Sequence, residues 1–144
     1  MTTKRRILLA DDHALVRAGI RALLESLPGV EVVGETGDGL EAVEHVRRDP
    51  PDAILLDITL PGMNGLEAAA RIAKLDVPTR VLMLSMHASA EYAARALAAG
   101  AAGYLNKDSA FDELATALEE IFAGRRYLCR AIDVDQLGGA AAGD

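Results

Sequence analysis

The side chains of this chain that could do chemistry stand where short apolar runs end. They are Asp11 and Asp12 after residues 7–10, Asp57 closing residues 53–57, Ser85 after 81–84, and Lys107 just beyond 103–105. Continuous apolar runs of this length are typical of strands buried on both faces of a parallel sheet. In such sheets, ligands bind beyond the carboxyl ends of the strands. We therefore expect these five side chains to meet at one edge of a sheet.

Three carboxylates at one edge predict a bound cation. At a separation of ~5 Å and an effective dielectric of ~20, each pair repels by roughly 3 kcal/mol. A hard divalent ion relieves this repulsion, and oxygen ligands favour Mg²⁺. With Mg²⁺ and Lys107 as countercharges, the edge could hold a phosphoryl group, with the Asp57 carboxylate as nucleophile. The hydroxyl of Ser85 could donate a hydrogen bond to a phosphoryl oxygen.

The segments between these runs predict the elements that position the side chains. Apolar residues recur at helical spacing over residues 13–27, and a weaker strand at 30–34, containing a polar residue, is expected at the sheet edge. Helices are also predicted after each later strand: from Leu40, after the Pro61-Gly62 turn, over 89–99, and from Phe111 to Phe122. Strand and helix alternate five times, which predicts an α/β fold with a parallel sheet covered by helices on both faces.

Composition is consistent with one globular domain. The 144 residues carry a net charge of −7, which argues against nucleic-acid binding by the general surface. No apolar run approaches a membrane span, and a single cysteine, Cys129, suits a reducing compartment, so we expect a cytoplasmic protein. We place a domain at residues 1–124. Residues 125–144 are basic and then rich in Gly and Ala, and are interpreted as a tail or truncated linker.

Several sequence motifs resemble those of the response-regulator receiver domains (CheY-like). They are Leu8-Leu-Ala-Asp-Asp-His13, Leu55-Leu-Asp-Ile-Thr-Leu-Pro-Gly-Met-Asn-Gly65, Leu84-Ser85 and Gly103-Tyr-Leu-Asn-Lys107. The resemblance covers residues 5–124. It implies a doubly wound, flavodoxin-like sheet of five parallel strands in the order 2-1-3-4-5, with five helices.

The resemblance also implies a role for each matching residue. Asp57 would accept a phosphoryl group from a sensor histidine kinase, and Lys107 would pair with that group. Asp11, Asp12, Asp57 and the backbone carbonyl of Thr59 would bind Mg²⁺. Ser85 and Tyr104 would be the switch residues, with Tyr104 turning inward after phosphorylation. We thus expect a signalling switch that catalyses its own phosphorylation and dephosphorylation.

The segments 11–19 and 103–108 are similar to those of the NarL/FixJ subfamily, which usually carries a LuxR-type DNA-binding output domain. That output domain is absent from this chain, so transcription control, and any contact with DNA, would pass through a domain not present here. The resemblance also implies a homodimer through the first and fifth helices.

Other interpretations compete with this one. A haloacid-dehalogenase-like phosphatase needs a second aspartate two residues after the nucleophile, where this chain has Thr59. A flavodoxin-like cofactor binder needs a loop rich in hydroxyl groups and glycine after the first strand, where Asp11 and Asp12 would repel the cofactor phosphate. A docking receiver that works without phosphorylation stays open as an alternative. For single residues, Asp12 could simply cap the first helix, Tyr104 could be a core residue, and His13 is interpreted as a surface residue.

Overall fold

The computed structural model describes residues 4–87 and 89–132. Within these ranges the chain alternates strands and helices, and its strands form one parallel sheet in the order β2-β1-β3-β4-β5-β6. The strands are β1 (Arg5–Ala10), β2 (Val30–Thr36), β3 (Ala53–Asp57), β4 (Arg80–Ser85), β5 (Gly103–Asn106) and β6 (Tyr127–Leu128). This is the predicted CheY-like order for the first five strands, with β2 at the edge of the sheet.

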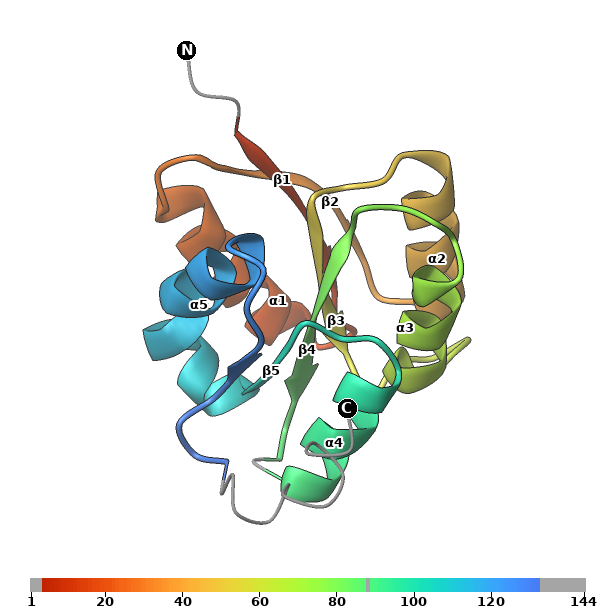
Figure 1. The fold of residues 1–144 in the computed structure, drawn as a ribbon. Coiled ribbons are helices and arrows are strands. Elements are labelled where there is room, and N and C mark those ends of the chain that lie inside the picture. Colours follow the sequence, from red (N-terminus) through yellow and green to blue (C-terminus); the bar gives the residue numbers. More distant parts are fainter. Residues whose placement is uncertain (1–3, 88, 133–144) are drawn as a thin grey trace.

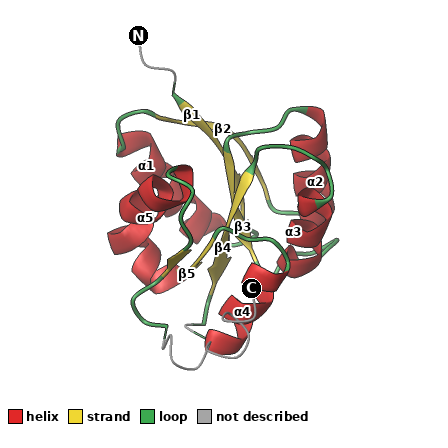
Figure 2. Cartoon of the chain, viewed as in Figure 1, coloured by secondary structure: helices red, strands yellow, loops and turns green. Residues whose placement is uncertain are grey.

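Five helices cover the two faces of the sheet (Figures 1 and 2). They are α1 (Ala14–Ser26), α2 (Gly39–Arg48), α3 (Gly65–Ala73), α4 (Ala90–Ala98) and α5 (Lys107–Phe122). Helices α1 and α5 lie together on one face, and α2, α3 and α4 cover the other (Figure 1). The sheet is thus buried between two helical layers, which explains why its strands are continuous apolar runs rather than alternating ones.

Polar side chains that cap the first turn mark the start of most of these helices. Asp38 accepts hydrogen bonds from the backbone N–H groups of Leu40 (2.8 Å) and Glu41 (3.0 Å) at the start of α2. Asn64 and Asn106 cap α3 and α5 in the same way. Such side-chain caps typically stabilise a helix by about 1 kcal/mol. They also fix the point at which each strand-to-helix loop ends, and therefore the position of the residues that precede it.

The core is aliphatic and centred on β3. All five residues of β3 are buried, as are the last four residues of β1 and the last five of β4. One aromatic side chain, Tyr104 of β5, is also fully buried among them. A rigid, close-packed central sheet is what holds the residues at its carboxyl edge in fixed positions.

Two expectations need correction. The described sheet has a sixth strand: β6 lies within the segment interpreted as a tail and pairs in parallel with β5, and Cys129 and Ile132, which follow it, are buried. The prediction of five strands missed it because a two-residue strand carries too little sequence pattern to be recognised. Asp12 does not cap α1 either, because the N-cap position is occupied by His13 and no side chain accepts a capping hydrogen bond there.

No helix in the described part of the chain is long and apolar enough to cross a bilayer.

Candidate functional site

The strand register places the predicted site residues at one edge of the sheet. Ala10 pairs with Leu56, so Asp11 and Asp57 leave neighbouring strands at the same level. Asp57 pairs in turn with Leu84 of β4, and Ser85 pairs with Asn106 of β5, the residue before Lys107. Because all of these strands run parallel, their carboxyl ends converge, and the polar residues that follow them meet.

Asp57 is the last residue of β3, and its carboxylate is held at both oxygens. The backbone N–H of Thr59 donates to Oδ1 at 3.1 Å, and Lys107 Nζ donates to Oδ2 at 2.8 Å. Only 1% of the residue surface is exposed. Burial raises the pKa of Asp57 above its ordinary value, while Lys107 opposes this shift and Asp11 adds to it. A buried carboxylate with this balance is the kind of group found at functional sites.

The loop after β3 folds back tightly on the Asp57 backbone. A Cβ atom added to Gly65 would lie 2.1 Å from the carbonyl oxygen of Asp57, so only glycine fits at this position. The N–H of Gly65 also donates to the carbonyl of Ile58 at 2.7 Å. The glycine of the Asp57–Gly65 motif therefore fixes the exit of the chain from β3, and with it the direction of the Asp57 side chain.

Lys107 begins α5 and is almost fully buried. Its Nζ lies 2.8 Å from Asp57 Oδ2, 3.0 Å from Asp11 Oδ1 and 2.7 Å from His13 Nδ1. One ammonium group thus links the ends of β1 and β3 across the site. It partly offsets the charge of the carboxylates, which explains how two buried aspartates can be tolerated so close together.

Asp11 and Asp12 differ in burial. Asp11 is fully buried and its Oδ1 accepts the backbone N–H of His13 at 2.8 Å, whereas the Asp12 side chain is 36% exposed. Asp11 Oδ2 lies 3.0 Å from Lys107 Nζ as an ion pair but receives no hydrogen bond in the described structure. The ammonium of Lys107 therefore compensates the charge of this buried carboxylate.

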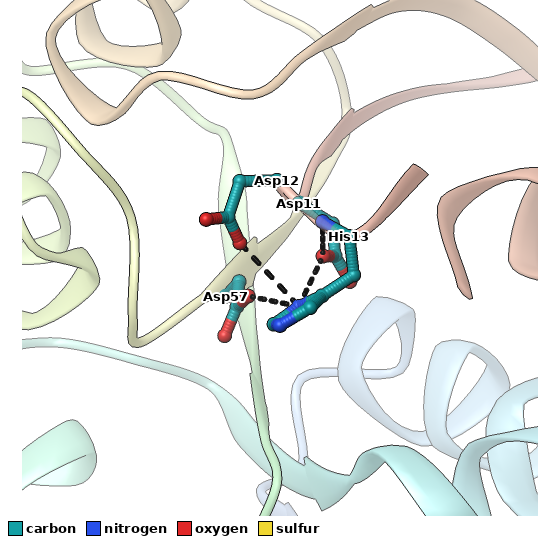
Figure 3. A group of neighbouring side chains, drawn as sticks. All are labelled: Asp11, Asp12, His13 and Asp57. Carbon is teal, nitrogen blue, oxygen red and sulfur yellow. Dashed lines mark hydrogen bonds and ion pairs between the residues drawn. The ribbon is translucent and has the colours of Figure 1, made fainter. Parts of the chain in front are cut away.

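His13 also belongs to this site, although the sequence interpretation left it on the surface. Its imidazole is about half exposed but reaches toward the carboxylates, as Figure 3 shows. Nδ1 lies 3.2 Å from Asp11 Oδ1, 3.4 Å from Asp12 Oδ1 and 3.6 Å from Asp57 Oδ2. The sequence signal that indicates this position is the place of His13 immediately after two aspartates at a strand end.

The residues fit the Mg²⁺ site that the sequence predicts. Ligand atoms from Asp11, Asp12, His13 and Asp57 all lie within 4.8 Å of one another. Three of the four are carboxylate oxygens, the ligands that a hard cation prefers. For Thr59, the structure places the backbone N–H on Asp57; a role for its carbonyl oxygen stays a prediction.

Ser85 and Tyr104 are joined through the backbone of one residue. The N–H of His87 donates to Ser85 Oγ at 3.1 Å, and the hydroxyl of Tyr104 donates to the carbonyl of His87 at 2.6 Å. Tyr104 is fully buried, and burial raises the pKa of its phenol above the ordinary value. The side chain that was expected to turn inward after phosphorylation already points inward in this structure.

Comparison with known proteins agrees with this geometry. The family model of the response regulator receiver domain matches residues 7–119. The chain therefore belongs to the response regulator receiver family, whose members act in two-component signalling. Receiver domains bind Mg²⁺ in an acidic pocket, and this chain has the corresponding cluster of aspartates.

The relatives place the chain among regulators of the NarL/FixJ type. It is 42% identical over 126 residues to the response regulator UvrY of Escherichia coli K12, an alignment that covers 88% of this chain and 58% of UvrY. A LuxR-family two-component response regulator from Aurantimonas sp. SI85-9A1 is 43% identical, with a TM-score of 0.85, over 90% of this chain and 93% of that one.

The signal receiver domain of NarL from Mycobacterium tuberculosis is 41% identical, with a TM-score of 0.81, over 85% of this chain and 99% of that domain. This chain spans just over half the length of UvrY. What it shares with that relative is thus the receiver portion.

Proposed function

We propose that Asp57 accepts a phosphoryl group from the phosphohistidine of a sensor histidine kinase. The observation that carries this proposal is the placement of Lys107 Nζ between the buried carboxylates of Asp57 and Asp11. In the transfer, a carboxylate oxygen of Asp57 forms a bond to phosphorus as the bond from phosphorus to the histidine nitrogen breaks. The result is an acyl phosphate on Asp57 and a neutral imidazole on the kinase.

The residues of the site have separate roles in this step. Lys107 remains beside Asp57 and stabilises the negative charge on the phosphoryl oxygens. Asp11, Asp12 and Asp57, with the carbonyl of Thr59, would hold Mg²⁺, which supplies further countercharge when bound. The Thr59 N–H keeps the Asp57 carboxylate oriented. Self-catalysed dephosphorylation would use the same groups, with water as the attacking nucleophile.

A switch follows from the link between Ser85 and Tyr104. When the Ser85 side chain rotates so that its hydroxyl donates to a phosphoryl oxygen, Oγ moves away from the His87 N–H, and the backbone that holds the Tyr104 hydroxyl must adjust. We infer that this adjustment alters the surface formed by α4, β5 and α5. A hydrogen bond to a charged group contributes about 1.5–3 kcal/mol, a useful fraction of the ~5.5 kcal/mol that would invert a two-state equilibrium.

The output of the switch is proposed from the relatives. A DNA-binding domain outside this chain would receive the signal and control transcription, and a homodimer through α1 and α5 would present two such domains. Support for the dimer is that Leu15 and Phe111 are exposed apolar side chains on these two helices. A cytoplasmic location, suggested by the single free cysteine, Cys129, is part of the same proposal. The alternative is a docking receiver that binds its partner without phosphorylation.

Mass measurement after incubation with acetyl phosphate tests the proposal. We expect the wild-type chain to gain the mass of one phosphoryl group when Mg²⁺ is present and much less when it is chelated. Asp57→Asn should take up none, because the nucleophile is lost. Asp112→Asn, which removes an exposed carboxylate from α5, is the matched control and should behave as wild type. Undiminished uptake by Asp57→Asn would refute the assignment and favour a different acceptor residue.

A further inference from the structure

The segment that follows α5 closes the outer edge of β5. Within the described sheet β5 lies between β4 and β6, and β6 is the short blue strand beside β5 in Figure 1. The N–H of Cys129 donates to the carbonyl of Tyr104 in β5 at 2.9 Å. The chain then turns, and the N–H of Ile132 donates to the carbonyl of Cys129 at 3.0 Å. We name residues 127–132 the strap.

A buried carboxylate of α5 fastens the strap. Glu113 Oε1 accepts hydrogen bonds from the Tyr127 hydroxyl at 2.6 Å and from the Arg130 N–H at 3.0 Å, so it holds the strap on both sides of Cys129. The backbone of the strap also comes close to β5, because a Cβ atom at Gly103 would lie only 2.8 Å from the Tyr127 carbonyl oxygen. The strap is therefore attached both to the sheet and to a helix.

Tyr104 is the residue of β5 that the strap covers. Its backbone carbonyl accepts the Cys129 N–H, and at the far end of the side chain its hydroxyl donates to the His87 carbonyl at 2.6 Å. Burial raises the pKa of the phenol, and the nearby thiol of Cys129 raises this pKa further. Tyr104, Cys129 and Ile132 are all buried in one apolar cluster. Both the backbone and the side chain of Tyr104 are thus close to the strap.

The strap stands where the ring of Tyr104 would leave the interior. On its inner side β5 is paired with β4, and α4 packs on β5. The way out to solvent is therefore past the outer edge of β5, which the strap occupies. An outward Tyr104 would have to displace Cys129 and Ile132, whose buried apolar contacts would be lost.

We propose that the strap locks the switch residue Tyr104 in its inward orientation. Opening of the strap and the outward turn of Tyr104 are then a single transition between two states. In the closed state the ring is buried and Cys129 is covered, whereas in the open state both are exposed to solvent. Glu113 sets the balance between the two states, because it fastens the strap without touching the phosphorylation site.

A phosphoryl group on Asp57 would act on the same transition through Ser85. When Ser85 rotates toward the phosphoryl group it leaves room that an inward Tyr104 ring can fill, so phosphorylation favours the closed strap. Coupling between two sites is reciprocal, and a closed strap in turn favours the phosphorylated state. The state of Asp57 would in this way reach the segment that leads away from α5. This step rests on the proposed function, but the lock on Tyr104 does not.

Broadening of aromatic NMR signals by a soluble gadolinium chelate tests the lock. In the wild-type chain the ring signals of Tyr104, assigned with Tyr104→Phe, should be protected. Glu113→Gln should expose them to broadening, and Tyr127→Phe, which removes one of the two donors to Glu113, should do so less. Asp112→Asn removes an exposed carboxylate from the same helix and should keep the wild-type protection.

A modified wild-type chain gives the same test without a variant. A bulky aromatic disulfide on Cys129 cannot be buried, so it holds the strap open, and a reducing agent removes it again. We expect the Tyr104 ring to become accessible to the chelate in the modified chain and protected once more after reduction. A ring that stays protected while Cys129 carries the adduct would overturn the proposal.

The rate at which a thiol reagent labels Cys129 tests the coupling to Asp57. Beryllofluoride with Mg²⁺ should slow labelling of the wild-type chain about fivefold, a typical coupling between two sites. Labelling of Asp57→Asn should not respond. An unchanged rate in a chain that has bound beryllofluoride would overturn the coupling. Failure of beryllofluoride to bind would instead count against the proposed phosphoacceptor and leave the result for the lock on Tyr104 standing.

Discussion

At the residue scale, Asp57, the proposed phosphoacceptor, is held at a cost to stability. Its carboxylate is buried next to that of Asp11, and the two share one ammonium group from Lys107. Burial raises its pKa, so the folded chain binds a proton at Asp57 more tightly than the unfolded chain does. The charge of this residue therefore opposes folding at neutral pH, where the proposed phosphoryl transfer requires the ionised carboxylate.

Asp57→Asn should for this reason raise the melting temperature by a few degrees at neutral pH in the absence of Mg²⁺. The folded-state pKa of Asp57 lies above the unfolded value of about 3.9. The destabilising contribution of the Asp57 charge is therefore absent at a pH below the unfolded-state pKa. It grows as the pH rises toward the folded-state pKa and is constant above it. The increase in melting temperature of the variant should show the same pH dependence when thermal denaturation is measured at several pH values. Asp112→Asn is the control, and a less stable Asp57→Asn at pH 7 would contradict the argument.

At the scale of elements, a buried carboxylate of α5 adds to the pairing with β5 in holding β6 to the domain. Glu113 Oε1 accepts hydrogen bonds from the Tyr127 hydroxyl at 2.6 Å and from the backbone N–H of Arg130 at 3.0 Å. Burial pushes the pKa of Glu113 upward, but these hydrogen bonds and the Arg130 charge outweigh it and lower the pKa overall. Burial and the hydrogen bond to Glu113 raise the pKa of Tyr127 to about 12.

Glu113→Gln should loosen β6, because hydrogen bonds to a charged acceptor contribute about 1.5–3 kcal/mol. Cys129 offers a direct readout: it is the single cysteine of the sequence, it is buried immediately after β6, and its N–H donates to the Tyr104 carbonyl. We expect its labelling by a thiol reagent to speed up about tenfold, which corresponds to ~1.4 kcal/mol.

The neighbouring exposed carboxylate of Asp112 provides the control for this experiment. Asp112→Asn removes the same charge from the same helix and should leave the labelling rate of Cys129 unchanged. Tyr127→Phe, which removes only one of the two donors, should give an intermediate rate. Equal rates in Glu113→Gln and wild type would show that pairing with β5 alone holds the strand.

Over the whole molecule, the path from Ser85 to Tyr104 connects the site with the α4–β5–α5 surface. Beryllofluoride with Mg²⁺, a stand-in for the phosphoryl group, should shift NMR signals of both residues in the wild-type chain. In Ser85→Ala the signal of Tyr104 should change little, because the His87 N–H no longer has an acceptor that phosphorylation can withdraw. Thr79→Ala removes a hydroxyl elsewhere in the chain and should keep the wild-type response. A Tyr104 shift in Ser85→Ala that is as large as in the wild-type chain would exclude this relay.

The α1–α5 face is the second feature at this scale. Phe111 lies over Gly19, since a Cβ atom at Gly19 would be 3.2 Å from its ring, and Leu15 is one helical turn before Gly19. The two exposed apolar side chains therefore share one face. Leu15→Glu should shift sedimentation from dimer toward monomer, whereas Leu40→Glu, an exposed residue on α2, should not. A wild-type chain that sediments as a monomer, with or without beryllofluoride, would remove the dimer from the proposal.

The sequence by itself determined the alternation of strands and helices and the edge at which Asp11, Asp57 and Lys107 meet. This was possible because buried parallel strands are continuous apolar runs and because the residue that ends each run is local information. Tertiary structure decided the rest. β6 is too short to show a pattern and exists only because β5 offers an edge and Glu113 a buried acceptor.

The position of His13 likewise depends on residues distant in the chain. Its ring could point to solvent or to the site, and the choice is made by Lys107 and Asp57, which approach it only after the sheet has formed. The same holds for the inward orientation of Tyr104, which is fixed by the hydrogen bond that its hydroxyl donates to the His87 carbonyl. Sequence spacing could place Asp57 at the end of a strand; only the packed sheet could show that a histidine and a lysine share its oxygens.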